Sequence, residues 1–155
     1  MLCRILPLLA VAAITASAQK YTGPMPAKPD LPYLKHASDL VPTEAATAKE
    51  DKKKDDVTYT IEGAGSSAKT PLASPIFIMQ SDKISPDHLG LYKLDVKNGR
   101  REIVFGPKKQ PKAIRIVATR LTGNVYKIEV DESLESGQYS LSPEGSNQVF
   151  CFEVF

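Results

Sequence analysis

The sequence contains no tryptophan, two cysteines and two histidines among its 155 residues. Zinc sites take three or four cysteine, histidine or acidic ligands, and two distant histidines with one strand cysteine do not supply them. A serine-hydrolase triad needs a histidine beside an activated serine, but neither His36 nor His88 lies near a Gly-x-Ser-x-Gly motif. We therefore expect no catalytic residue, no metal and no cofactor. A hydrolase with an unrecognised loop site is kept as an alternative.

Long apolar runs are also absent, except at the N-terminus. Arg4 is followed by an apolar run from Ile5 to about Ala16 and by the small-x-small triplet that ends at Ala18. This order is typical of a secretory signal peptide, and the run is shorter than a permanent membrane-spanning helix needs. We expect residues 1–18 to be removed by cleavage after Ala18, which predicts a secreted or periplasmic protein with no transmembrane segment.

Removal of residues 1–18 changes both the charge and the cysteine count. Cys3 is lost, so Cys151 is the one remaining cysteine and no intramolecular disulfide can form. Arg4 is lost too, and 19 Lys and Arg residues then face 18 Asp and Glu residues. A net charge so close to zero gives no reason to expect a nucleic-acid partner.

Residues 19–55 show no strand-like alternation and hold five of the 12 prolines. They lead into eight consecutive charged residues, 49–56, which cannot bury apolar area and therefore predict a solvated linker. Between Pro32 and Pro42, apolar side chains recur at helical spacing and predict a short helix over residues 32–41. This helix would lie on the protein's own surface or bind a partner protein through Tyr33, Leu34, Leu40 and Val41.

Residues 56–155 consist of short alternating runs separated by turn residues, with no long helical stretch. Asn98-Gly99 between two such runs is a strong hairpin signal, and the implied register sets Tyr92 opposite Phe105. A second hairpin is expected to turn at residues 122–124, and two further strands are expected near the C-terminus. About seven to eight regular strands predict an all-β sandwich over residues 56–155.

Leu134, Gly137 and Tyr139 form the pattern Leu-x-x-Gly-x-Tyr between two of these strands. The pattern resembles the tyrosine corner of Greek-key sandwiches such as immunoglobulin and fibronectin type III domains. This resemblance implies that the Tyr139 ring lies in the core and that its hydroxyl binds a backbone group a few residues upstream. It also implies that Gly137 supplies permissive backbone and that Leu134 closes the end of the core. The missing tryptophan and cysteine pair separate the chain from antibody domains.

Charge is unevenly distributed over the predicted sandwich. Residues 97–120 hold eight cations and one acid, whereas residues 128–155 hold six acids and no Lys or Arg. The cationic region would suit an anionic glycan or a lipid headgroup. Alternatively, these residues keep hairpin tips solvated and pair with acids on adjacent strands, as Arg115 would with Asp131. The candidates for anion binding are Lys97, Arg100, Arg101, Lys108, Lys109, Lys112 and Arg115.

Cys151 lies in a C-terminal run whose two alternating faces are both largely apolar, so we expect its thiol to pack as a small buried hydrophobe. If this strand were at a sheet edge, it would offer a site for pairing with another protein. These observations favour an exported, non-catalytic β-sandwich that binds another protein or serves as a structural module of the envelope or secretome.

We predict that the exported protein begins at Gln19. Signal peptidases cut after a small-x-small triplet, so intact-mass measurement of protein recovered from the periplasm or medium should give the mass of residues 19–155. Ala18→Phe should block this cut. Exported wild-type protein that still carries Met1 would contradict the prediction.

Overall fold

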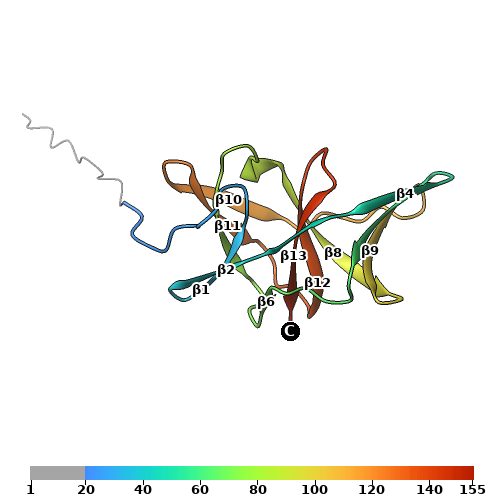
Figure 1. Cartoon of the computed structure of the whole chain (residues 1–155), viewed down its shortest axis with the longest axis horizontal. Coiled ribbons are helices and arrows are strands. Elements are labelled where there is room, and N and C mark those ends of the chain that lie inside the picture. Colours follow the sequence, from blue (N-terminus) through green and yellow to red (C-terminus); the bar gives the residue numbers. More distant parts are fainter. Residues whose placement is uncertain (1–19) are drawn as a thin grey trace, which may run out of the picture.

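A computed structural model describes residues 20–155, and in them antiparallel strands build two sheets (Figure 1). The predicted signal peptide lies outside the described residues. The one helical element within them is a short 3-10 helix, Pro86–His88 (η1). The five-stranded sheet has the order β10 (Ile116–Thr122), β11 (Val125–Val130), β7 (Ile76–Gln80), β1 (Tyr33–His36) and β2 (Asp39–Pro42). The all-β prediction is confirmed, and the two sheets are consistent with a β-sandwich.

The larger sheet closes on itself. In order it contains β3 (Glu44–Thr47), β13 (Gln148–Val154), β12 (Gly137–Pro143), β8 (Leu89–Lys97), β9 (Arg100–Phe105), β5 (Asp56–Glu62) and β4 (Lys49–Lys53), and β6 (Lys69–Thr70) pairs in parallel with β13. Ala48 alone separates β3, which pairs with β13, from β4, which pairs with β5. One extended segment therefore joins the two ends of what we call the rolled sheet.

Strand β13 separates two hydrophobic cores. Phe150, Phe152 and Val154 face the core between the two sheets, where the Phe152 and Phe77 ring centroids are 5.0 Å apart. Val149 and Cys151 alternate with them and face a second core inside the rolled sheet. Full burial of one such side chain stabilises the fold by roughly 1.5–3 kcal/mol. Both faces of β13 must therefore be apolar, as the sequence pattern indicated.

The Tyr139 side chain lies where the chain passes from β11 in the five-stranded sheet to β12 in the rolled sheet. Its ring is buried and stacks on Phe152 with centroids 5.5 Å apart. Its hydroxyl donates a hydrogen bond of 2.7 Å to the carbonyl of Glu135, four residues upstream. Leu134 is buried beside it, and Gly137 has a φ of 156°, which other residues rarely adopt. These contacts tie the crossover to the core.

The structure corrects the helix and linker predicted between residues 19 and 55. Residues 33–36 and 39–42 form the β1–β2 hairpin in place of a helix, with Ala37 at a φ of 52° in its turn. The reason is tertiary pairing: Leu34 lies opposite Phe77 of β7 and is 1% exposed, so contacts across the sheet outweigh the helical spacing of the sequence. Tyr33 is buried with it, and these two residues are not free for a partner.

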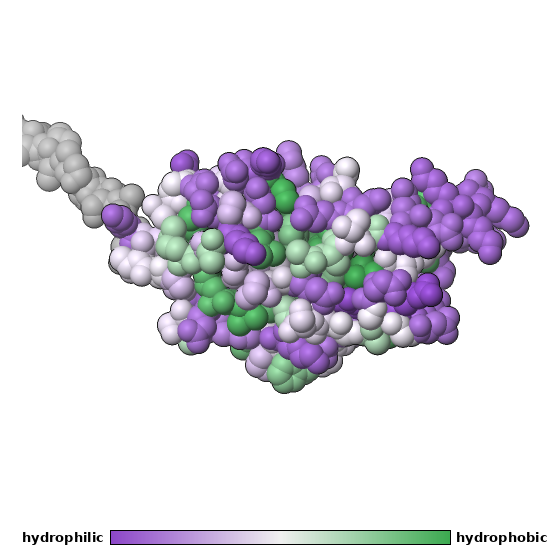
Figure 2. Space-filling view, in the orientation of Figure 1, coloured by the Kyte–Doolittle hydropathy of each residue, from purple (hydrophilic) through white to green (hydrophobic). Residues whose placement is uncertain are grey.

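The charged run at residues 49–56 is not a linker either. Residues 49–53 form β4, whose side chains are all exposed while its backbone pairs with β5. Figure 2 shows this hairpin as a hydrophilic end of the molecule. The backbone hydrogen bonds hold the strand, so the segment orders without burying its charges. The boundary predicted at residue 56 thus falls between two paired strands.

The hairpins predicted within residues 56–155 are confirmed. Asn98 and Gly99 have φ values of 51° and 72° and connect β8 to β9. The backbone pairing runs from Lys97 and Arg100 to Asp95 and Glu102, and beyond it the Tyr92 and Phe105 rings are in contact, with centroids 5.6 Å apart. Residues 123–124 connect β10 to β11, and Arg115 forms an ion pair of 3.3 Å with Asp131.

We predict that Tyr139→Phe lowers the free energy of unfolding by about 1 kcal/mol, because the Glu135 carbonyl loses its donor in a partly buried place. Denaturant unfolding monitored by circular dichroism measures this. Tyr59→Phe is the control, since its hydroxyl makes an exposed bond of 3.3 Å and its loss should cost less than about 0.5 kcal/mol. Equal effects in both variants would contradict the role given to the Tyr139 hydroxyl.

Candidate functional site

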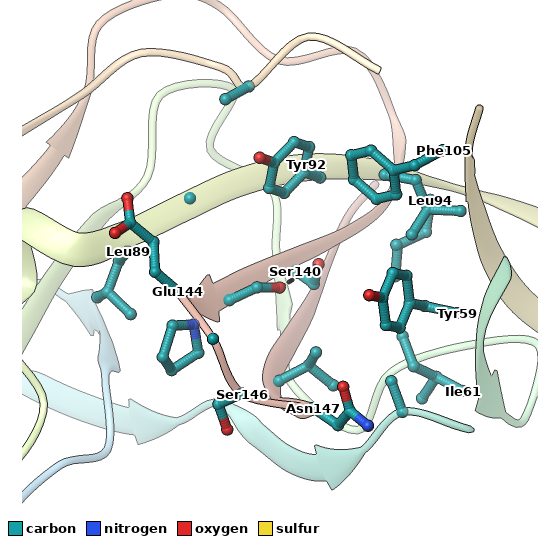
Figure 3. Close-up of a pocket in the computed structure, with 18 of the residues that line it drawn as sticks. Tyr59, Ile61, Leu89, Tyr92, Leu94, Phe105, Ser140, Glu144, Ser146 and Asn147 are labelled. Carbon is teal, nitrogen blue, oxygen red and sulfur yellow. Dashed lines mark hydrogen bonds between the residues drawn. The ribbon is translucent and has the colours of Figure 1, made fainter. Parts of the chain in front are cut away.

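A cavity of about 480 Å³ lies inside the rolled sheet, above its inner core (Figure 3). Alternate residues of a strand point to the same face, so the inward residues of five strands form its wall. The loop at residues 143–147 and Ala113 complete it. The wall residues on the strands include Val57, Tyr59, Ile61, Leu89, Tyr92, Leu94, Ile103, Phe105, Ser140, Ser142 and Val149.

Three aromatic rings stand along one part of this wall. The ring planes of Tyr59 and Tyr92 make angles of 80° and 82° with that of Phe105, at centroid distances of 6.0 and 5.6 Å. Figure 3 shows the Tyr92 ring beside the Phe105 ring, and the Tyr59 ring below Phe105 on the same side of the cavity. Rings in such edge-to-face contact support one another and offer flat apolar surface to a ligand.

The polar residues of the cavity are the two tyrosines, Ser140 and Ser142 on β12, and Glu144, Ser146 and Asn147 of the loop. The hydroxyl oxygens of Ser140 and Ser142 are 3.1 Å apart and bond to each other. The Tyr59 hydroxyl donates to Glu50 on β4, and burial, with a further contribution from this carboxylate, raises the pKa of Tyr59, so the phenol stays protonated. Of residues 20–155, no Lys, Arg or His lines the cavity. The arrangement can hold an apolar body and bond to its polar edge.

The cavity exists because β8 and β9 separate. Their backbone pairing runs from the hairpin turn as far as Asp95 and Glu102 and then stops. Further along β8, the backbone N–H of Ile114 donates to the Leu91 carbonyl at 2.8 Å, so residues 106–115 take the place of β9 there. Small residues such as Gly90 and Ser140 keep the resulting space open.

In the structure, the predicted anion-binding residues lie in separate places. Lys97 and Arg100 lie at the β8–β9 turn, whereas Lys108, Lys109 and Lys112 lie in the loop beyond the other end of β9. Lys97 forms an ion pair of 3.4 Å with Glu102, and Arg115 pairs with Asp131 as the alternative interpretation held. The seven cations therefore do not form one surface.

Arg101 is the clearest departure from that prediction, because its side chain is 1% exposed. Its guanidinium makes two bonds to the Glu44 carboxylate, of 2.7 and 3.2 Å, and donates to the carbonyls of Glu62 and Gly63. Burial alone raises the pKa of Glu44, but the bonds from Arg101 and from the Ser67 N–H outweigh it and hold that pKa below its usual value. Arg101 is thus a structural cation inside the rolled sheet and is not available to an anionic ligand.

The two histidines lie in separate elements. His36 is on β1, where its Nε2 atom is buried without a hydrogen-bond partner. His88 is in η1 and borders a smaller cavity of about 210 Å³ with Ser85 and Glu144. The hydrogen bonds found among residues 20–155 do not join the His88 ring to either of them. Residues 20–155 also contain no group of three His, Cys, Asp or Glu side chains placed to hold a metal ion.

Cys151 is fully buried, and burial raises the pKa of its thiol to about 12. The thiol therefore stays protonated and packs in the inner core. Its strand pairs on both sides and is not a sheet edge. No helix within the described part of the chain is long and apolar enough to cross a membrane.

Comparisons with protein-family models, with curated proteins and with solved structures find no match to this chain.

We predict that Glu44→Gln destabilises the fold by about 3 kcal/mol at neutral pH, because it leaves the buried Arg101 without its counter-charge. The folded-state pKa of Glu44 is lowered, so this contribution is complete above the unfolded value near 4.5 and is lost as the pH falls through the folded-state pKa. The difference between wild type and Glu44→Gln should therefore be constant above about pH 6 and shrink below about pH 4.5. Denaturant unfolding at several pH values measures it.

Glu102→Gln is the matched control for Glu44→Gln. Glu102 neighbours Arg101 on β9, and its side chain is 22% exposed against 23% for Glu44, but its partner is the exposed Lys97. Its loss should cost less than about 1 kcal/mol. A cost equal to that of Glu44→Gln would show that burial of Arg101 is not the cause.

Proposed function

We propose that the protein is an exported, non-catalytic binding module whose binding site is the cavity inside the rolled sheet. The observation that carries the proposal is the cavity itself: about 480 Å³, walled by three aromatic rings and aliphatic side chains, with a few hydroxyl groups. Ligand sites typically measure 300–1,000 Å³ and have such mostly apolar walls.

The residues of the cavity wall indicate which part of a ligand would enter the cavity. A flat or aliphatic apolar group would contact Tyr59, Tyr92 and Phe105, and burial of such a group drives association. The paired hydroxyls of Ser140 and Ser142 would bond to a polar edge of the ligand. A protein partner that inserts an apolar side chain would use the same wall. The immunoglobulin-like Greek-key architecture belongs to this proposal, since such domains commonly bind, although a fold does not define a ligand.

Titration with N-phenyl-1-naphthylamine, a neutral aromatic probe whose fluorescence rises in apolar surroundings, tests this proposal. We predict saturable one-to-one binding that Phe105→Ala weakens about tenfold, since one aromatic contact and its buried area are lost. Phe155→Ala removes the same ring from a site that is 64% exposed and should leave the affinity unchanged.

Ser142→Leu provides a second variant, because it fills part of the cavity while keeping the aromatic wall. Ser142→Leu should also weaken binding of the probe. Thermal melting of each variant verifies that the variant is folded. Absence of saturable binding to wild-type protein, or binding that neither cavity variant changes, would refute the proposal.

A further inference from the structure

The loop at residues 106–115, here called the basic loop, begins and ends at the cavity wall. It follows Phe105 and returns through Ala113, and both of these residues line the cavity. A tight turn in which Gly106 and Lys109 exchange backbone hydrogen bonds of 2.7 and 3.2 Å holds its start. The bond from the Ile114 N–H to the Leu91 carbonyl holds its end. The loop is therefore anchored beside the cavity at both ends.

Lys108, Lys109 and Lys112 are the charged residues of this loop before Arg115, and all three are exposed. None of them forms an ion pair with another of residues 20–155, in contrast to Lys97 and Arg115. Three unpaired cations within five residues produce a local positive potential that attracts anions.

The other charged groups near the cavity do not cancel this potential. In the β4–β5 hairpin, the three lysines at residues 52–54 equal Asp51, Asp55 and Asp56 in number, but Asp56 lies against Gly106 at the start of the basic loop and offsets one of the loop's three positive charges. Glu144 is the one carboxylate among the described lining residues, and it is exposed. The surroundings of the cavity thus combine an apolar interior with an excess of cations outside it.

We infer that the ligand is an amphiphile, whose apolar body enters the cavity and whose anionic carboxylate or phosphate group contacts the lysines of the basic loop. The inference rests on the proposed function, because it uses the same cavity. No Lys, Arg or His among residues 20–155 lines the cavity, and the buried Arg101 is already paired with Glu44, so a buried anion would be unpaired and its anionic group must remain outside. The long lysine side chains can reach such a group while it stays hydrated.

The chain supplies its own control for this inference. Lys97 and Arg100 belong to the same stretch of sequence as the basic loop but lie at the opposite end of β9, since Arg100 pairs with Glu62 and Phe105 pairs with Val57. Arg120 lies on β10 in the other sheet. Substitution of these three cations removes the same formal charge as substitution of the three loop lysines, without changing the surroundings of the cavity.

The experiment measures competition against N-phenyl-1-naphthylamine by decanol, decanoate, decyl phosphate and inorganic phosphate, with each amphiphile below its critical micelle concentration. At low salt, we expect decanoate and decyl phosphate to bind the wild-type protein about tenfold more tightly than decanol, because several exposed ion pairs each contribute a modest amount. Inorganic phosphate should not compete. The advantage of the anionic ligands should vanish near 0.5 M salt, where screening is severe.

The triple variant Lys108→Gln, Lys109→Gln, Lys112→Gln should bind decanol normally and lose the preference for decanoate. The control variant Lys97→Gln, Arg100→Gln, Arg120→Gln should keep that preference. Equal binding of decanol and decanoate, or equal loss in both variants, would overturn the inference and leave the cavity as a site for neutral ligands. Competition by inorganic phosphate without any by decanol would overturn it in favour of a simple anion site. If neither the probe nor any of the amphiphiles bound the wild-type protein, the proposed function would be refuted as well.

Discussion

The structure depends on one extended segment, residues 44–53, which pairs with β13 in its first half and with β5 in its second. Ala48, at the junction, is 3% exposed, and its N–H donates to the Asn147 carbonyl at 2.7 Å. If the segment ended at Thr47, β3 would still pair with β13, but β5 would expose unpaired backbone, which is costly and invites association. The inner core would also be open to water. Closure of the rolled sheet therefore secures the strands, the inner core and the cavity together.

The Arg101–Glu44 pair reinforces this closure from within. Glu44 belongs to the closing segment, and Arg101 belongs to β9, so the pair connects parts of the rolled sheet that are not hydrogen-bonded neighbours. A buried pair contributes stability only when its remaining donors are satisfied. Here two backbone carbonyls accept from the guanidinium and the Ser67 N–H donates to the carboxylate, which meets that condition.

Most strands beyond residue 56 could be predicted because their own apolar residues and the turn residues between them mark them as strands. Tyr92 and Phe105 were set opposite each other by the Asn98-Gly99 turn, and their rings are in contact. Residues 33–53 could not be predicted in this way. The helical spacing of Leu34 and Leu40 is coincidental, and the charged residues of β4 form a strand only because β5 provides hydrogen-bonding partners. Leu34 also pairs with Phe77 of β7, and local sequence contains no sign of a partner that lies so far along the chain.

The candidate site, too, could be predicted from the sequence only in part. The residues of its aromatic wall were visible as strand positions, but the cavity was not, because it arises where the basic loop replaces β9 beside β8. Likewise, composition identified a cationic stretch but could not sort the buried Arg101 from the exposed lysines. By itself the sequence determined that the chain is β-rich and that its last strand has two apolar faces. The tertiary structure alone decided which strands close the rolled sheet, where space remains inside it and which cations stand beside that space, because these depend on contacts between residues that are distant in sequence.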